Sequence, residues 1–207
     1  MAYRRTPAVQ ARLDATRARI VDAGLTLVAE GGWRAARVTT IAERAGVATG
    51  TVYRHVEDKD ALCAEVFRRA ATRELDRVAR AADGAGTARE RVESALRTFA
   101  GRALRAPRLA SALLAEPAPP AVEAERRRYR RDHRDVFRRV VAEGIARGEL
   151  AEGDSEIVAA ALVGAMGEAL LGPLAVVDHE NPEPAVDALV ATCLRALPPP
   201  PDGAAAG

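Results

Sequence analysis

Apolar residues recur along most of the chain at intervals of three and four positions, which is the spacing of amphipathic helices. A clear case is the series Val92, Leu96, Phe99 and Ala103, which places four apolar side chains on one helical face. Glycine pairs, prolines and acidic turns separate the periodic segments. The pattern predicts no strand, and it predicts helices at residues 9–30, 38–45, 50–56, 60–82, 88–106, 107–114, 121–147, 155–177 and 184–197.

The composition strengthens this prediction. Alanine, a strong helix former, supplies nearly half of the residues counted as hydrophobic, and β-branched residues are comparatively few. We therefore expect an all-α fold of closely packed helices, in which each small side chain buries little area. Such a thin core favours the burial of a shared face by dimerisation. Residues 198–207, which are rich in proline, glycine and alanine, are expected to be a disordered tail.

The segment at residues 38–57 has the spacing of a helix-turn-helix motif. Ala42 is small enough to let two helices approach, and Gly46 can adopt the positive φ of a tight turn. Val52 can seal the junction from the second helix. These features predict an N-terminal, three-helix DNA-binding domain over residues 1–62.

The second helix of this motif would expose hydroxyl, aromatic and basic side chains, which can donate hydrogen bonds to phosphates and base edges in a major groove. Lys59 stands at the start of the next helix, where free backbone N–H groups and the helix dipole also favour a phosphate. The candidate DNA-binding residues are Arg37, Thr39, Thr49, Gly50, Thr51, Tyr53, Arg54, His55 and Lys59.

Several linked blocks within residues 15–65 resemble the N-terminal domain of tetracycline-repressor-like (TetR-family) transcriptional regulators. The resemblance rests on Gly31-Gly32-Trp33, Ile41-Ala42, Ala45-Gly46-Val47, Gly50-Thr51-Val52-Tyr53-Arg54-His55-Val56 and Lys59-Asp60-Ala61-Leu62. It implies a homodimeric, all-helical repressor that binds a double-stranded DNA operator, with a C-terminal domain for ligand binding and dimerisation. The few aromatic residues of the chain favour an apolar or amphipathic small-molecule effector over a nucleotide.

The chain departs from the family pattern at Arg37, where family members often place a threonine that caps the first helix of the motif. Two arrangements fit this departure. Either the helix starts after Arg37 with a poorer cap, or Thr40 caps a shorter helix, since Thr40 and Glu43 have the spacing of a capping box. Trp33, just before the motif, is expected to fill the core beneath it rather than to stack on a base.

The predicted helix at 121–147 carries two polar residues, Arg126 and His133, within an apolar stripe. They either reach solvent or neighbouring polar groups, or line an effector pocket formed with the helices at 88–106 and 155–177. In such a pocket Arg126 would favour an acidic ligand. The candidate effector-binding residues are Phe99, Arg126, Tyr129, His133, Phe137 and Met166.

The last two predicted helices present alanine and glycine faces, which permit close approach of another helix. Glu168 is the one charged residue between positions 157 and 177, and its carboxylate needs a partner across a dimer, a place at the bundle edge, or a ligand. We expect these helices to form the dimer interface. The candidate interface residues are Ala161, Ala165, Glu168, Ala169, Leu189 and Leu194.

Two other classes of protein compete with this interpretation. A helical enzyme with a vestigial motif would need a catalytic constellation, but the sequence has no Ser/His/Asp grouping, phosphate-binding loop or metal-ligand spacing. We therefore expect no enzymatic activity, cofactor or metal. A membrane-associated protein would use residues 157–177, but alanine, glycine and Pro173 dilute this stretch and no aromatic belt flanks it.

The net charge of +2 is nearly balanced, so charge alone does not indicate a nucleic-acid partner. Locally, residues 1–62 carry ten basic and seven acidic side chains, which suits a DNA-binding domain followed by an effector-binding and dimerisation domain at 63–197. Cys63 and Cys193 form neither a disulfide framework nor a metal pattern, and the first twenty residues lack the apolar core of a signal peptide. Both observations predict a cytoplasmic protein.

Overall fold

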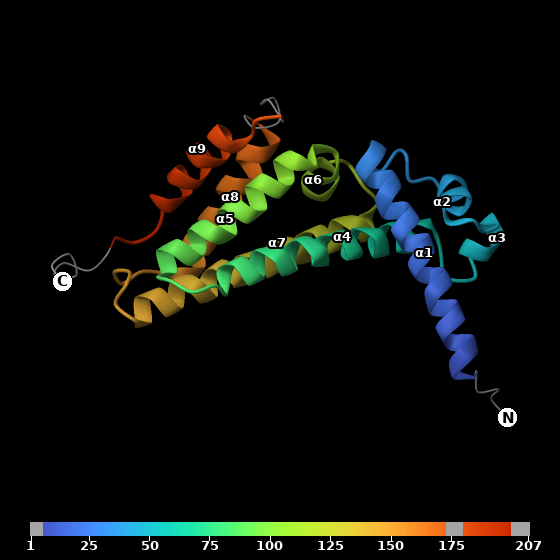
Figure 1. The fold of residues 1–207 in the computed structure, drawn as a ribbon, viewed down its shortest axis with the longest axis horizontal. Coiled ribbons are helices and arrows are strands. Elements are labelled where there is room, and N and C mark those ends of the chain that lie inside the picture. The colour runs from blue at the N-terminus through green and yellow to red at the C-terminus, as the bar shows by residue number, and fades with distance from the viewer. Residues whose placement is uncertain (1–5, 173–179, 200–207) are drawn as a thin grey trace. The chain divides into compact units, whose positions relative to one another are not determined.

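The computed structural model describes residues 6–172 and 180–199 (Figure 1). Within these ranges every regular element is a helix, which confirms the predicted all-α class. No helix among the described residues is long and apolar enough to cross a membrane. The helices are α1 (Pro7–Gly31), α2 (Val38–Ala45), α3 (Thr49–Val52), α4 (Lys59–Ala82), α5 (Ala88–Arg105), α6 (Pro107–Leu114), α7 (Pro120–Ala146), α8 (Ser155–Leu171) and α9 (Glu183–Leu194).

Most of these helices begin and end within a few residues of the predicted bounds. The helix predicted at 50–56 is shorter, because the chain leaves α3 in turns on its way to α4, with Val56 buried at the bend. The helix predicted at 155–177 is described as far as Leu171, and residues 173–177 lie outside the described part of the chain. Most of the tail expected to be disordered, residues 200–207, also lies outside it.

The chain divides into two compact units. The first contains the chain up to Ala71 together with residues 111–126, and the second contains residues 72–110 and the chain from Arg127 onward. Helices α4, α6 and α7 each contribute to both units. The first unit therefore extends beyond the domain predicted at 1–62, because it also takes in the start of α4 as far as Ala71, the end of α6 and the start of α7.

In the first unit, α2 packs against α1 and α3 packs against α2 (Figure 1). Thr6 caps α1 by accepting a hydrogen bond from the N–H of Val9. Trp33 is buried, its ring stacks on Phe67 at a centroid distance of 6.5 Å, and its indole N–H donates to the carbonyl of Ala112 at 3.1 Å. The prediction that Trp33 fills the core is therefore confirmed.

In the second unit, α9 lies along α5, and α8 contacts both of these helices (Figure 1). Thr87 and Glu90 form a capping box that starts α5, which satisfies two backbone N–H groups. On the apolar face predicted from Val92, Leu96, Phe99 and Ala103, the first two side chains are fully buried and the last two are half-buried. This unit provides the core around the candidate effector residues.

Candidate nucleic-acid interface

The turn between α2 and α3 has the geometry that the sequence predicts. Gly46 has a φ of +67°, in the left-handed region that favours glycine, and its N–H closes the end of α2. Ala42 and Val52 are almost fully buried, so the small alanine allows close approach and the valine fills the junction. The predicted helix-turn-helix is confirmed.

The first helix of this motif begins directly after Arg37, which is extended and makes no capping hydrogen bond with its side chain. The alternative, in which Thr40 and Glu43 form a capping box, is therefore wrong. Val38 and Ile41 are buried in the helix that forms instead. Burying a valine contributes about 1.5–3 kcal/mol, whereas a cap contributes about 1 kcal/mol, so packing fixes the start of α2.

The candidate DNA-binding residues lie at the surface of the first unit. Tyr53 is 50% exposed, which is high for a large aromatic side chain. A hydroxyl on an exposed ring can donate to a phosphate or to a base edge. The other exposed candidates are Arg37, Thr39, Gly50, Arg54 and Lys59, and the half-buried ones are Thr49, Thr51 and His55.

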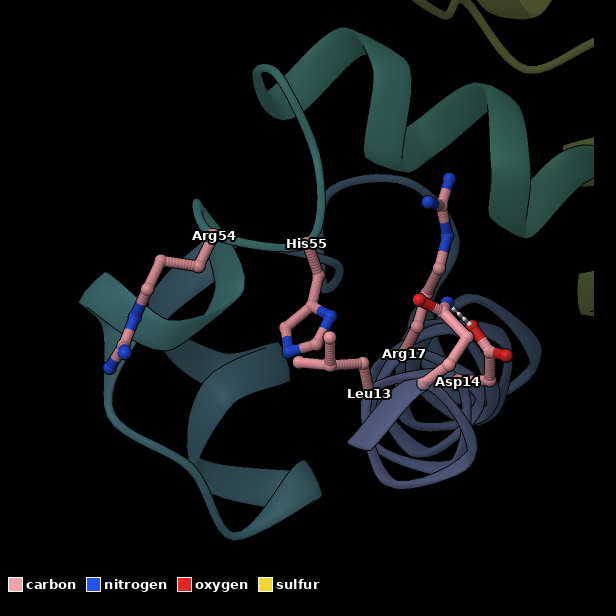
Figure 2. Close-up of a pocket in the computed structure, with 6 residues that line it drawn as sticks. Leu13, Asp14, Arg17, Arg54 and His55 are labelled. Carbon is pink, nitrogen blue, oxygen red and sulfur yellow. Dashed lines mark hydrogen bonds between the residues drawn. The ribbon is translucent and has the colours of Figure 1, made fainter. Parts of the chain in front are cut away.

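A hollow of about 340 Å³ lies between α1 and the end of α3 (Figure 2). In Figure 2 the His55 ring points toward Leu13 of α1, whereas Arg54 extends away from that helix. Arg17, on the α1 side, is held by Glu65 at 2.7 Å. Sequence analysis missed the α1 wall of this hollow, because a contact between segments about 40 positions apart leaves no local signal. The lining residues are Gln10, Leu13, Asp14, Arg17, Arg54 and His55.

Lys59 is the first residue of α4, as predicted for a phosphate contact at a helix start. The side chain of Asp58 accepts a hydrogen bond from the N–H of Ala61 at 2.7 Å. One of the backbone N–H groups expected to be free for a phosphate is therefore already occupied. The exposed ammonium of Lys59 remains the group suited to contact the DNA backbone.

Three candidate effector residues form a contact cluster in the second unit. The His133 ring meets Tyr129 and Phe99 edge-on, with centroid distances of 4.2 and 5.4 Å. Burial lowers the pKa of His133 and raises the pKa of Tyr129, because each charged form would lose its hydration. Near Tyr129, Arg102 donates two hydrogen bonds to Glu74, so these two charges offset each other. The cluster is therefore neutral and largely apolar.

The other effector candidates differ in burial and in the unit to which they belong. Phe137 and Met166 are fully buried in the core of the second unit. Arg126 belongs to the first unit, where its guanidinium satisfies neighbouring groups, which is one of the roles that the sequence left open. We therefore leave Arg126 out of the effector site. Its partners are the backbone carbonyls of Ala112, Leu113 and Glu116 and the carboxylate of Glu123.

Comparison with known proteins bears directly on this arrangement. Residues 20–66 match the family model described as bacterial regulatory proteins of the tetR family. Residues 85–170 match the model described as the tetracyclin repressor-like C-terminal domain. The chain belongs to the TetR family. The first match contains the whole helix-turn-helix, and the second contains Phe99, Tyr129 and His133.

Two curated bacterial regulators match part of the chain. The fatty acid metabolism regulator protein of Bacillus subtilis (strain 168) is 30% identical over 73 residues, which cover 35% of this chain and 38% of that protein. The HTH-type transcriptional repressor KstR of Mycolicibacterium smegmatis is 38% identical over 76 residues, or 37% of each chain. The matched segments thus span less than two fifths of either relative.

Solved structures of transcriptional regulators share the fold along most of this chain. FadR from Bacillus subtilis, solved in complex with stearoyl-CoA, has a TM-score of 0.72 at 19% identity and covers 86% of this chain and 98% of its own. A TetR/AcrR-family regulator from Thermobifida fusca has a TM-score of 0.67 at 24% identity, with coverage of 86% and 96%. At these identities the likeness establishes the fold alone.

The face of α8 predicted to form a dimer interface is open to solvent in the single chain. Ala161, Ala165 and Glu168 are exposed, and Ala169 is half-buried. Small side chains on an exposed helix face allow a second helix to approach closely. The two candidates of α9 differ from these residues of α8, because both are already buried within their own chain. They are Leu189 and Leu194.

Proposed function

We propose that this TetR-family chain is a cytoplasmic, homodimeric transcriptional regulator, a repressor that leaves a palindromic operator when a small apolar or amphipathic effector binds. The observation that carries the proposal is the helix-turn-helix at α2 and α3, which leaves Tyr53 and Arg54 exposed beside α3. Two such motifs in a dimer would enter successive major grooves, about 34–36 Å apart. This geometry requires an operator with two-fold symmetry.

The second unit is the proposed effector-binding part. The FadR structure with stearoyl-CoA supports an amphipathic effector for this fold, and the cluster of Phe99, Tyr129 and His133 supplies aromatic surface for one in this chain. Phe137 and Met166 belong to the buried apolar core of the same unit. An effector releases DNA when it prefers a dimer that cannot fit both grooves, with a coupling free energy of about 1–3 kcal/mol.

Capture of genomic DNA tests the proposal directly. The purified full-length chain is incubated with fragments of the genome that encodes it, and the bound fragments are sequenced. We expect enrichment of a shared palindrome whose half-sites lie about one helical turn, or a multiple of it, apart. Binding that is equal for all fragments and disappears with added salt would be purely electrostatic and would contradict a regulator with a defined operator.

The proposed dimer interface on α8 gives a testable substitution. Ala165→Arg places a charge without a partner in the seam between two chains, which costs several kcal/mol when the charge is buried. We expect a dimer dissociation constant raised about 100-fold or more, measured by analytical ultracentrifugation, and a matching loss of operator affinity.

The matched control for this prediction is Ala146→Arg, which adds the same charge at the exposed end of α7 in the same unit. This control is expected to remain a dimer. If Ala165→Arg also remains a dimer with unchanged operator affinity, the interface lies on another face and this part of the proposal is wrong.

A further inference from the structure

His133 holds a buried polar atom that has no hydrogen-bond partner in the part of the chain that the structure describes. The side chain is 2% exposed, and among the described residues nothing hydrogen-bonds to its Nε2 atom. Buried polar atoms are nearly always paired, by protein, by water or by a ligand, because an unpaired one loses its hydration without compensation. The orphaned Nε2 therefore indicates a partner that the described residues do not supply.

The other ring nitrogen determines what kind of partner this is. His133 Nδ1 lies 3.0 Å from the backbone carbonyl oxygen of Tyr129. A carbonyl oxygen can only accept, so Nδ1 carries the hydrogen and donates it. Burial lowers the pKa of His133 and keeps the ring neutral, which leaves a lone pair on Nε2. The missing partner is a hydrogen-bond donor.

The surroundings of His133 suit a mainly apolar molecule without a net charge. The Tyr129 and Phe99 rings contact the imidazole, and Phe99 is half-buried, so the cluster reaches the surface of the unit at that residue. Of the charges that act on the ring, Glu74 is paired with Arg102, and Asp132 lies 3.8 Å from Arg128. Arg126, which sequence analysis offered as the partner of an acidic effector, is bound in the other unit.

We propose that the effector is a neutral alcohol or phenol, an apolar body whose hydroxyl group donates a hydrogen bond to His133 Nε2. This inference rests on the proposed function and names the chemical class of the effector. The edges and faces of the Phe99 and Tyr129 rings contact the apolar body. A carboxylate has no hydrogen to donate to Nε2, so it binds this site more weakly than an alcohol of the same size.

The test uses phenol as the donor probe and anisole as its match, in which a methyl group replaces the hydroxyl hydrogen. The full-length protein is labelled with ¹⁵N-histidine, and the His133 resonances are assigned from their loss in His133→Gln. Phenol is expected to shift the Nε2 resonance toward that of a hydrogen-bonded acceptor, whereas anisole leaves its position unchanged.

Affinity gives a second readout. By calorimetry, the wild-type protein is expected to bind phenol about 10-fold more tightly than anisole. This preference is lost in His133→Phe, which keeps an aromatic ring but has no acceptor. It persists in part in His133→Gln, whose amide oxygen can accept. Circular dichroism confirms that both variants are folded.

Several outcomes would overturn the inference: equal affinity for the two probes, no binding of phenol up to the solubility limit of anisole, or an Nε2 resonance that phenol does not move. If the Nε2 resonance already has the shift of a hydrogen-bonded acceptor before a probe is added, the partner is a buried water, and this result also overturns the inference. The capture of genomic DNA is independent of His133. Intact operator binding with a failed phenol test thus rejects the effector class alone, whereas failed operator capture rejects the proposed function.

Discussion

Replacing Thr49, Tyr53 and Lys59 together with alanine is expected to abolish specific operator binding. Thr49 and Tyr53 lie at the two ends of α3 and Lys59 begins α4, so the triple variant removes a hydroxyl, an aromatic ring and a cation from the surface expected to face DNA. Each direct contact contributes about 1–3 kcal/mol, and the combined loss corresponds to at least about 100-fold in affinity. Mobility shifts on the captured operator measure it.

The fold should survive this change, because none of the three side chains is buried and the junction residues Ala42 and Val52 are intact. A matched control, Thr26→Ala with Arg34→Ala, removes exposed groups from the same unit outside the motif and is expected to bind the operator normally. Undiminished binding by the triple variant, with an unchanged melting temperature, would mean that α3 does not read the operator.

The single variants separate two kinds of contact. Lys59→Ala should weaken binding to all DNA sequences alike, because phosphates carry no sequence information. It should also reduce the slope of log affinity against log salt concentration by the amount expected for about one phosphate contact. Thr49→Ala should instead relax the preference at particular base pairs. Titrations at several salt concentrations, on the operator and on scrambled DNA, distinguish the two effects.

The positions of the helices follow closely from the sequence because they depend on local patterns. Apolar spacing places α5 and α7, and Gly46 marks the end of α2 because few other residues adopt its φ of +67° easily. The start of α2 was harder to predict. A local capping pattern at Thr40 competes with the burial of Val38, and burial depends on the rest of the fold.

The helix-turn-helix that carries the candidate DNA-binding residues could be predicted for the same reason, since the whole motif lies within about 20 consecutive residues. The role of Arg126 could not. An arginine in an apolar stripe has the same local pattern whether it lines a pocket or satisfies backbone carbonyls. In the structure, its guanidinium donates to the carbonyl of Ala112 at the end of α6. The indole N–H of Trp33, 79 residues before Ala112 in the chain, donates to the same carbonyl. Contacts between such distant segments leave no periodic signal.

Gly32 and Glu116 belong to the same long-range arrangement. Gly32 has a φ of +69°, and a Cβ atom there would lie 2.3 Å from the Glu116 carboxylate. That carboxylate accepts a hydrogen bond from the backbone N–H of Trp33 at 2.9 Å. The connection between α6 and α7 is thus hydrogen-bonded to the turn that precedes α2, and both segments belong to the first unit.

Arg126 makes several of the hydrogen bonds that hold the end of α6 and the residues after it, and Arg126→Ala is expected to destabilise the protein strongly. The side chain is 7% exposed, its Nε donates to the Leu113 carbonyl at 3.0 Å, and its Nη2 donates to the carbonyls of Ala112 and Glu116 at 3.1 and 2.8 Å. Nη1 pairs with Glu123. Alanine would leave three carbonyls without this donor and would remove a partly buried ion pair, at a cost of about 3 kcal/mol.

Trp33 makes this loss measurable, because it is the one tryptophan of the chain and its indole N–H binds the Ala112 carbonyl that Arg126 also contacts. Urea unfolding followed by Trp33 fluorescence should show a midpoint lowered by roughly 1–2 M in Arg126→Ala. The exposed neighbour Arg127→Ala is the matched control and should change stability by less than about 0.5 kcal/mol. An unchanged urea midpoint in Arg126→Ala, together with a weakened response to an effector, would contradict this structural role and show that Arg126 belongs to the effector site. A ligand-binding arginine can be removed from an empty pocket with little loss of stability.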